Sequence, residues 1–268
     1  MKMLNVACGS RYHREWVNID FAPASDLVKK VNVLEGLPFD NDSFDVVYSS
    51  HFLEHLSPEQ AKFFLRECYR VLKPGGIIRI VVPDLENICR EYLRILNLAL
   101  NDEKYEKFYD WIVIELLDQL VRVESGGNML KFFSWVHNSK DEELALYIKK
   151  RIGEEVLSDN MVKSTQKKIT IDKMKNKVLY LYLKFIRLLI PKSIRDLVFV
   201  NTPVGERHQW MYDRYSLTRI LKNTGFKDIE IMSYNTSNIP NFNSYLLDIN
   251  EDGTPYKGES SLYIEAKK

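Results

Sequence analysis

Residues 44–83 hold a strand, a helix and a second strand in succession, a unit that few folds accommodate. The two strand segments, FDVVYS (44–49) and IIRIVVP (77–83), are almost continuously apolar, as strands buried on both faces are. Between them, SPEQ (57–60) combines a capping serine, a proline at the first helical position and a glutamine that completes a capping box. Strands joined by a helix in this way belong to a layered α/β domain, so we expect a parallel sheet with helices on both faces.

Both ends of the chain continue this alternation. Further apolar runs of strand length occur at 3–8, 16–21, 26–33, 226–234 and 261–266. A late helix is expected from Asp213 to Asn223, with Gly225 as its stop. The strands therefore come from both ends of the sequence, and the middle of the chain is inserted between them.

This middle part, about 120 residues, is too long to be a simple connection. Apolar residues recur in it at three- and four-residue spacing, and one such helical face combines Ile88, Tyr92, Ile95, Leu96 and Ala99. We therefore expect residues 1–85 and 207–268 to form the core, and residues 86–206 to form an inserted helical cap. Both junctions leave from the edge where the parallel strands end, so the cap should cover that edge.

Composition narrows the class of protein. The net charge of +1 gives no general attraction to nucleic acid or membranes. The longest apolar run, 178–190, is too short and too charged to span a bilayer. Cys8, Cys68 and Cys89 show no metal-ligand spacing, and no other cluster in the sequence predicts a metal site. Only seven residues precede Cys8, too few for an export signal, so we expect a cytoplasmic protein with reduced cysteines.

The turn after the first strand, ACGS, is unusually compressed. It has one glycine, Gly9, and only residues 9–15 separate the first two strands, whereas a dinucleotide site needs three glycines for the approach of a pyrophosphate. This argues against NAD or FAD. S-adenosylmethionine has no phosphates and needs only a close backbone approach and an acid for its ribose hydroxyls, which Gly9 and Asp20 supply. A tight turn followed by a surface aspartate explains this stretch equally well.

Several segments, in the right order, resemble class I S-adenosylmethionine-dependent methyltransferases. They are VACGS, NID, VNVLEGLPFDNDSFDVVYSSHFLEHL, and RVLKPGG followed by IIRIVVPD. The resemblance covers residues 3–85 and 207–268. It implies a Rossmann-like sheet of seven strands, mainly parallel, with one antiparallel strand near the C-terminus, and S-adenosylmethionine as cofactor. More narrowly, YDWIVIELLDQLVRVESGGNM and HQWMYDRYSLTRILKNTGF resemble a bacterial group associated with surface-polysaccharide biosynthesis.

The resemblance also implies which residues bind the cofactor. These are Ala7, Cys8, Gly9, Ser10, Asp20, Asn32, Val33, Leu34, Ser49, Ser50 and His51. Residues 7–10 are expected around the methionine part, Asp20 at the ribose, residues 32–34 beside the adenine and residues 49–51 near the sulfonium. Ligands of open α/β sheets bind beyond the carboxyl ends of the strands, where these segments lie.

Two of these positions depart from the family pattern. Ala7 stands where glycine is usual, and a methyl group is tolerated there if the backbone angle is ordinary. Asn32 stands where many relatives carry aspartate, and an amide can still meet adenine or ribose without the charge.

Catalysis of methyl transfer requires an acceptor oxygen held on the axis of the sulfur–carbon bond and a group that takes its proton. His51 and His208 are the candidate catalytic residues, and the alternative for each is a structural role. The residues after His208, which include Gln209, Trp210 and Tyr212, suit a sugar. Glu54 and His55 are instead expected to serve the entry of the following helix, because LEH recurs in methyltransferases with unrelated substrates.

Three polar residues in the cap, Asp118, Gln119 and Arg122, lie at helical spacing. They either reach down to the acceptor or form an exposed polar face, and the exposed face is the preferred prediction.

The predicted function is O-methylation of a sugar-containing small molecule or a glycan in surface-polysaccharide synthesis. The alternative is a non-catalytic cofactor-binding or interaction protein on the same fold. A nucleic-acid methyltransferase lacks support, because no Asn-Pro-Pro-Tyr-like motif that could hold a flipped base follows the fourth strand.

Residues 163–195 contain ten Lys or Arg and one acid, Asp172. On a helix, Lys173, Lys177, Lys184 and Arg187 would share one side, opposite an apolar side. The apolar side either packs on the cap or on a second copy in a homodimer, or the segment makes peripheral contact with an anionic membrane.

Overall fold

The computed structural model describes residues 1–23, 25–158, 181–186, 188–191, 194–195 and 205–268. Its strands are β1 Met3–Val6, β2 Val17–Asp20, β3 Val28–Lys30, β4 Phe44–Ser50, β5 Leu72–Pro83, β6 Lys227–Met232 and β7 Ser261–Lys267. They form one sheet in the order β3-β2-β1-β4-β5-β7-β6. β7 runs opposite to the other six strands, so its pairings with β5 and β6 are antiparallel and the other pairings are parallel. This confirms the predicted Rossmann-like sheet.

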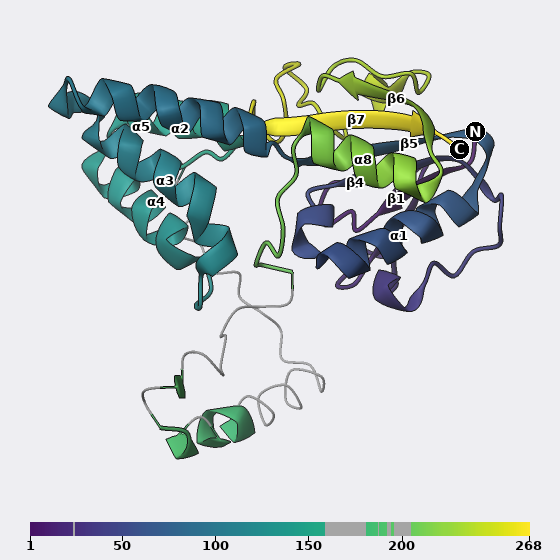
Figure 1. The fold of residues 1–268 in the computed structure, drawn as a ribbon, viewed down its shortest axis with the longest axis horizontal. Helices are drawn as coiled ribbons and strands as arrows, with labels where there is room; N and C mark the ends of the chain where they lie inside the picture. Colours follow the sequence, from purple (N-terminus) through teal and green to yellow (C-terminus); the bar gives the residue numbers. More distant parts are fainter. Residues whose placement is uncertain (24, 159–180, 187, 192–193, 196–204) are drawn as a thin grey trace.

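One face of the sheet is covered by helices α1 (Pro58–Val71) and α8 (Arg214–Thr224), which lie side by side (Figure 1). The predicted capping box is present, because the Ser57 hydroxyl accepts from the Gln60 N–H and the Gln60 side chain accepts from the Ser57 N–H. The apolar face of α1 is buried in the main core, as its spacing predicts.

The opposite face is covered by the connection between β6 and β7, residues 233–260. In its aromatic core Trp16, Tyr48 and Phe242 pack together. Among the described residues no α-helix covers this face, so the expectation of helices on both faces is wrong for this part of the chain. Residues 7–16 and 21–27, which join β1 to β2 and β2 to β3, are shorter than the dozen or so residues that a helical crossover needs.

A buried arginine ties this connection to the centre of the sheet. The guanidinium of Arg79 on β5 is fully buried and donates to the carboxylates of Asp248 at 2.7 Å and Glu265 at 2.8 Å. It also donates to the Thr236 carbonyl, and the Tyr48 hydroxyl donates to Asp248. Because every charge in this cluster has a partner, it can be buried at the interface between sheet and connection.

The described part of the cap contains α2 (Leu85–Ala99), α3 (Glu106–Val121), α4 (Gly127–Ser139) and α5 (Glu142–Ile152). These helices have a core of their own, in which Trp111, Val136 and Ile148 are completely buried. α2 begins two residues after β5 ends, so the helices gather beyond the edge where the parallel strands end (Figure 1).

Ion pairs hold the cap to the segment that returns to the core. Arg122 at the end of α3 pairs with Asp118 and with Glu206, and Asp118 also accepts from the Asn128 N–H at 2.7 Å. A Cβ at Gly127 would stand 2.5 Å from the Asp118 carboxylate, so this turn requires glycine. Asp118 and Arg122 are both buried, and the expected exposed polar face is therefore wrong for them.

The basic segment, residues 163–195, lies largely outside the described residues, and Lys173, Lys177 and Arg187 are among those outside. Residues 181–186 are helical, with Tyr182 and Phe185 both 59% exposed. The predicted membrane contact and homodimer stay predictions. In the described part of the chain, no helix combines the length and apolar character needed to cross a bilayer.

Candidate active site

The first turn, residues 7–11, follows β1 and is held by Asp20 at the end of β2. One carboxylate oxygen of Asp20 accepts from the Gly9 N–H at 2.9 Å, and the other accepts from the Ala22 N–H at 2.8 Å. Gly9 has a φ of +54°, and a Cβ placed on it would meet no atom within 4 Å. The turn thus leaves open space for a close backbone approach, as a ligand without phosphates requires.

Ala7 also lies in the left-handed region, with a φ of +54°. A methyl group at this position was expected to be tolerated if the backbone angle was ordinary, and the angle is not ordinary. An L-residue in this region costs about 1–2 kcal/mol per residue relative to the right-handed conformation. The first turn carries this strain next to the candidate ligand site, a place where such strain is commonly found.

The first cavity, of about 180 Å³, lies over this turn. Of the residues predicted to bind the cofactor, it is lined by Ala7, Cys8, Gly9, Ser10, Ser50 and His51. Burial raises the pKa of the Cys8 thiol to about 12, so this cysteine is not a nucleophile at neutral pH. The hydroxyl oxygens of Ser49 and Ser50 are buried without a hydrogen-bond partner among the described residues, and Ser50 lines the cavity.

The remaining predicted cofactor residues do not line this cavity. Asn32 caps a short 3-10 helix, η1 (Val33–Glu35): its oxygen accepts from the Leu34 N–H and its amide nitrogen donates to Glu35. Val33 is buried in the main core, whereas Leu34 is exposed. Their placement beside adenine, and that of Asp20 at ribose, stay predictions.

A loop from the other end of the chain completes the first cavity. It contributes Leu247, Tyr256 and Lys257, none of which was predicted. Arg11 holds it over the first turn, because its guanidinium donates to the Ile249 carbonyl and lies 4.2 Å from the centre of the Tyr256 ring. The sequence LLDINEDGTPYKGES contains turn residues but no periodicity that could have revealed this contact.

The second cavity, of about 270 Å³, lies between the strand ends and the cap. Its lining combines polar residues, among them Glu54, His55, Gln119 and His208, with apolar residues such as Phe133. His51 and Lys257 line this cavity as well as the first one. The two cavities therefore adjoin each other at the carboxyl end of β4.

His51 stands at this junction. It has a φ of +49°, and its ring lies 2.9 Å from the Ser261 hydroxyl through Nε2 and 3.6 Å from Glu54 through Nδ1. Burial, together with the positive charge of Lys257, lowers the pKa of His51 well below its usual value. The imidazole is therefore neutral at pH 7 and has a lone pair that can accept a proton.

Glu54 is a buried acid without a hydrogen-bond partner. Its side chain is 1% exposed, and both carboxylate oxygens lack a partner among the described residues. Burial raises the pKa of Glu54 to about 8. The helix entry that Glu54 was expected to serve is capped by Ser57 and Gln60 instead, so the carboxylate is left facing the second cavity.

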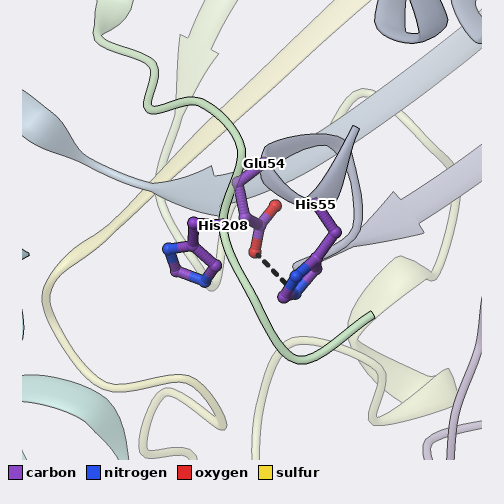
Figure 2. Close-up of side chains that lie close together, drawn as sticks. All are labelled: Glu54, His55 and His208. Atoms are coloured by element: carbon purple, nitrogen blue, oxygen red, sulfur yellow. Dashed lines mark ion pairs between the residues drawn. The ribbon is translucent and has the colours of Figure 1, made fainter. Parts of the chain in front are cut away.

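His55 and His208 flank this carboxylate (Figure 2). His55 Nδ1 lies 2.9 Å from the Arg207 carbonyl, which fixes it as the protonated nitrogen, and Nε2 lies 3.8 Å from Glu54. The His208 ring stands 4.8 Å from the His55 ring, and burial lowers the pKa of His208 to about 3. The backbone N–H of His208 donates to the backbone carbonyl of Gln119 on α3, which places His208 between cap and core.

The aromatic residues after His208 lie elsewhere. Trp210 and Tyr212 line a separate groove with Lys62, Arg66 and Arg219 on the outer face of α1 and α8. The expected cluster of His208 with Trp210 and Tyr212 around one sugar is therefore wrong, because the backbone turns between them. Both the Gln209 and Trp210 N–H groups donate to the Glu54 carbonyl at this turn.

Comparison with known proteins supports a methyltransferase domain. Residues 4–80 match the family described as "Methyltransferase domain". A "Probable methyltransferase ltbC" from Aspergillus luteorubrus is 40% identical over 57 residues, and an "Uncharacterized methyltransferase sll0829" from Synechocystis is 31% identical over 97 residues. These alignments cover 21% and 30% of this chain, and 20% and 46% of the two relatives, so the chain spans less than half of their length.

Among solved structures, a SAM-dependent methyltransferase from Archaeoglobus fulgidus aligns over 100% of this chain and 86% of its own, at 17% identity and a TM-score of 0.39. The matched segment, residues 4–80, contains β1, the first turn and β4. This segment is therefore similar to a methyltransferase domain, the class of protein that the sequence resembles.

Proposed function

We propose that this chain is an S-adenosylmethionine-dependent O-methyltransferase that acts on a sugar-containing small molecule or a glycan in surface-polysaccharide synthesis. The observation that carries the proposal is the adjacency of the two cavities, since His51 and Lys257 line both. One cavity lies over the first turn of a methyltransferase domain, and the other lies beneath the cap. A methyl donor and an acceptor bound in this way meet at the carboxyl end of β4.

The first cavity fits the methionine part of the cofactor. Gly9 leaves room for a close approach to the backbone, and the Ser50 hydroxyl is free to bond a ligand. When bound, S-adenosylmethionine supplies an electrophilic methyl group on a sulfonium, and its transfer leaves neutral S-adenosylhomocysteine. Asp20 holds the Gly9 N–H and keeps lone pairs for ribose hydroxyls, while residues 32–34 would flank the adenine.

His51 and His208 are the proposed catalytic residues. Both are neutral at pH 7, so each has a lone pair that can take the proton of an acceptor hydroxyl. Because the lowered pKa makes each a weak base, the proton is transferred as the oxygen bonds to the methyl carbon, when the hydroxyl becomes strongly acidic. His51 stands at the junction of the cavities and is the nearer of the two to the first turn. The cap forms one wall of the second cavity and supplies Gln119 and Phe133 for acceptor binding.

A cavity of about 270 Å³ with polar and apolar walls suits one sugar-sized group. Apolar Met129 and Phe133 can cover a sugar face, while Gln119 can bond hydroxyls. The association with surface polysaccharide rests on the resemblance of residues 109–129 and 208–226.

The test has two steps. Titration calorimetry of the full chain with S-adenosylmethionine should show one site, weakened strongly by Asp20→Ala. Incubation with nucleotide-linked sugars or glycan extracts should then yield S-adenosylhomocysteine, and His51→Ala should lower its rate of formation. Cofactor binding without turnover on any acceptor of this class would favour the alternative, a non-catalytic cofactor-binding protein.

Peripheral contact with an anionic membrane is proposed for the basic segment, residues 163–195, which contains ten basic residues and one acid. Each Lys or Arg near such a surface contributes on the order of 1 kcal/mol. Flotation with anionic vesicles at low and high salt tests this, with the triple charge reversal at Lys173, Lys177 and Lys184 as comparison. Absence of binding at low salt would leave packing on the cap or in a homodimer.

A further inference from the structure

Glu54, His55 and His208 form a cluster in the second cavity that no sequence spacing indicates. One ligand atom from each, a carboxylate oxygen or a ring nitrogen, lies within 4.8 Å of the others. Glu54 and His55 come from the turn after β4, whereas His208 arrives from beyond the cap (Figure 2). We infer that these three side chains bind one divalent transition-metal ion of the Zn²⁺ type.

The first argument for a metal ion comes from the side chain of Glu54. It is almost completely buried, and neither oxygen has a hydrogen-bond partner among the described residues. A buried carboxyl without a partner costs free energy, and in native structures such a group calls for an explanation. Its oxygens stand beside Nδ1 of His51 and Nε2 of His55, but neither distance, 3.6 Å or 3.8 Å, is a hydrogen bond. A bound cation would give the carboxylate the partner it lacks.

One of the two histidines, His55, is already oriented as a ligand. His55 donates its Nδ1 proton to the Arg207 carbonyl, so its Nε2 lone pair points toward Glu54. Metal-binding histidines commonly make such a second hydrogen bond, which orients the ring and fixes the tautomer.

The ligand set selects the class of ion. Two imidazole nitrogens and one carboxylate suit Zn²⁺ and its first-row neighbours, whereas Mg²⁺ and Ca²⁺ prefer oxygen ligands. Around a tetrahedral Zn²⁺ with bonds of about 2.0–2.1 Å, ligand atoms stand roughly 3.4 Å apart. The separation of 3.8 Å between Glu54 and His55 is already close to this value, and the ligand atom of His208 lies within 4.8 Å of both.

Three protein ligands leave a fourth position open, as in catalytic zinc sites. Here it would face the second cavity, where the acceptor is proposed to bind, so this role of the ion rests on the proposed function. An ion in this place would hold an acceptor hydroxyl and lower its pKa. With its ring nitrogen on the ion, His208 would act as a ligand, so of the two proposed proton acceptors His51 would take the proton. Lys257 lines the same cavity, and its positive charge opposes a cation.

Metal binding by the full chain, freed of metal with a chelator, tests the inference. Calorimetric titration with Zn²⁺ should show one site per chain. Glu54→Gln and His208→Ala should each weaken it by more than about tenfold, the low end of the loss typical for a residue that only orients a metal ligand. His137→Ala, a histidine of α4 outside the cavity, should bind Zn²⁺ as the unmodified chain does. Lys257→Met should bind more tightly, because a like charge is removed.

A second readout reports coordination directly. Co²⁺ in place of Zn²⁺ should give visible absorption bands of a four-coordinate site, which Glu54→Gln should alter or abolish. Circular dichroism of each variant establishes that it is folded. The inference is overturned if the chain binds no stoichiometric Zn²⁺, or if Glu54→Gln and His208→Ala bind it unchanged.

Titration with S-adenosylmethionine under the same conditions separates this inference from the proposed function. Cofactor binding without Zn²⁺ binding would overturn the metal site alone. Zn²⁺ binding that depends on Glu54 and His208, in a chain that binds no S-adenosylmethionine, would retain the metal site and overturn the methyltransferase proposal.

Discussion

One acid lies beside the first turn and another lies in the second cavity, each near a strand end, and the two acids differ in their partners. Asp20, beside the first turn, accepts hydrogen bonds from the N–H groups of Gly9 and Ala22. Glu54, in the second cavity, is more deeply buried and has no partner among the described residues. The first turn is thus preformed by its own contacts, whereas the second cavity keeps unsatisfied groups that a ligand can complete. We expect the two regions to respond differently to substitution.

The largest effect on stability is expected at Arg79, which orders the connection that reaches both cavities. Arg79→Met leaves the carboxylates of Asp248 and Glu265 buried without their charge partner, so the free energy of unfolding should fall by about 3–5 kcal/mol. Urea denaturation followed by circular dichroism measures this. A loss below about 1 kcal/mol, the value of an exposed pair, would show that the cluster is not buried in solution.

Cofactor binding should be most sensitive at Gly9. Gly9→Val places a branched side chain in the left-handed region and into the first cavity, so affinity for S-adenosylmethionine should fall by at least about 100-fold, or ~2.7 kcal/mol. Gly75→Val is a matched control: its φ is also positive, at +77°, a Cβ there also meets no atom within 4 Å, and it lies away from the cavities. If both variants lose the same affinity for S-adenosylmethionine, Gly9 is not part of the cofactor site.

The two acids themselves give a sharper comparison. Asp20→Asn turns one accepting oxygen into a donor opposite a backbone N–H, which should cost about 1–2 kcal/mol of unfolding free energy. Glu54→Gln removes no hydrogen bond among the described residues and should leave stability unchanged or slightly raised. Both are measured by urea denaturation in the presence of a chelator. A larger loss from Glu54→Gln than from Asp20→Asn would reverse the comparison.

The smallest effect is expected from Ala7→Gly. Glycine relieves the left-handed strain but adds entropy to the unfolded chain, so the net gain should be about 0–1 kcal/mol. The melting temperature of the variant should rise by a few degrees at most. A clear decrease would mean that Ala7 does not adopt a φ of +54° in solution.

The sheet could be predicted from the sequence because its signals are local. Strand length, the capping box at Ser57 and Gln60, and the stop at Gly225 each act within a few residues. Even here β5 begins at Leu72 rather than at Ile77, because Leu72 already pairs with Phe44 of β4, and an irregularity in register separates this pair from that of Ile77 with Val46.

The second cavity could not be predicted in the same way. Glu54 and His208 meet only because the cap returns the chain to the end of β4, and Lys257 arrives on a loop without periodicity. Asp118 and Arg122 look like a polar helix face in sequence, and only their contacts with Asn128 and Glu206 explain their burial. Contacts between distant segments leave no spacing for sequence analysis to detect.

A crystal structure of the full chain with S-adenosylhomocysteine tests the central claim most directly. The account predicts the methionine part of the ligand over residues 7–10 and its sulfur beside Ser50 and His51, facing the second cavity. A ligand bound away from the first turn, or bound there with its sulfur turned away from His51 and the second cavity, would contradict the account.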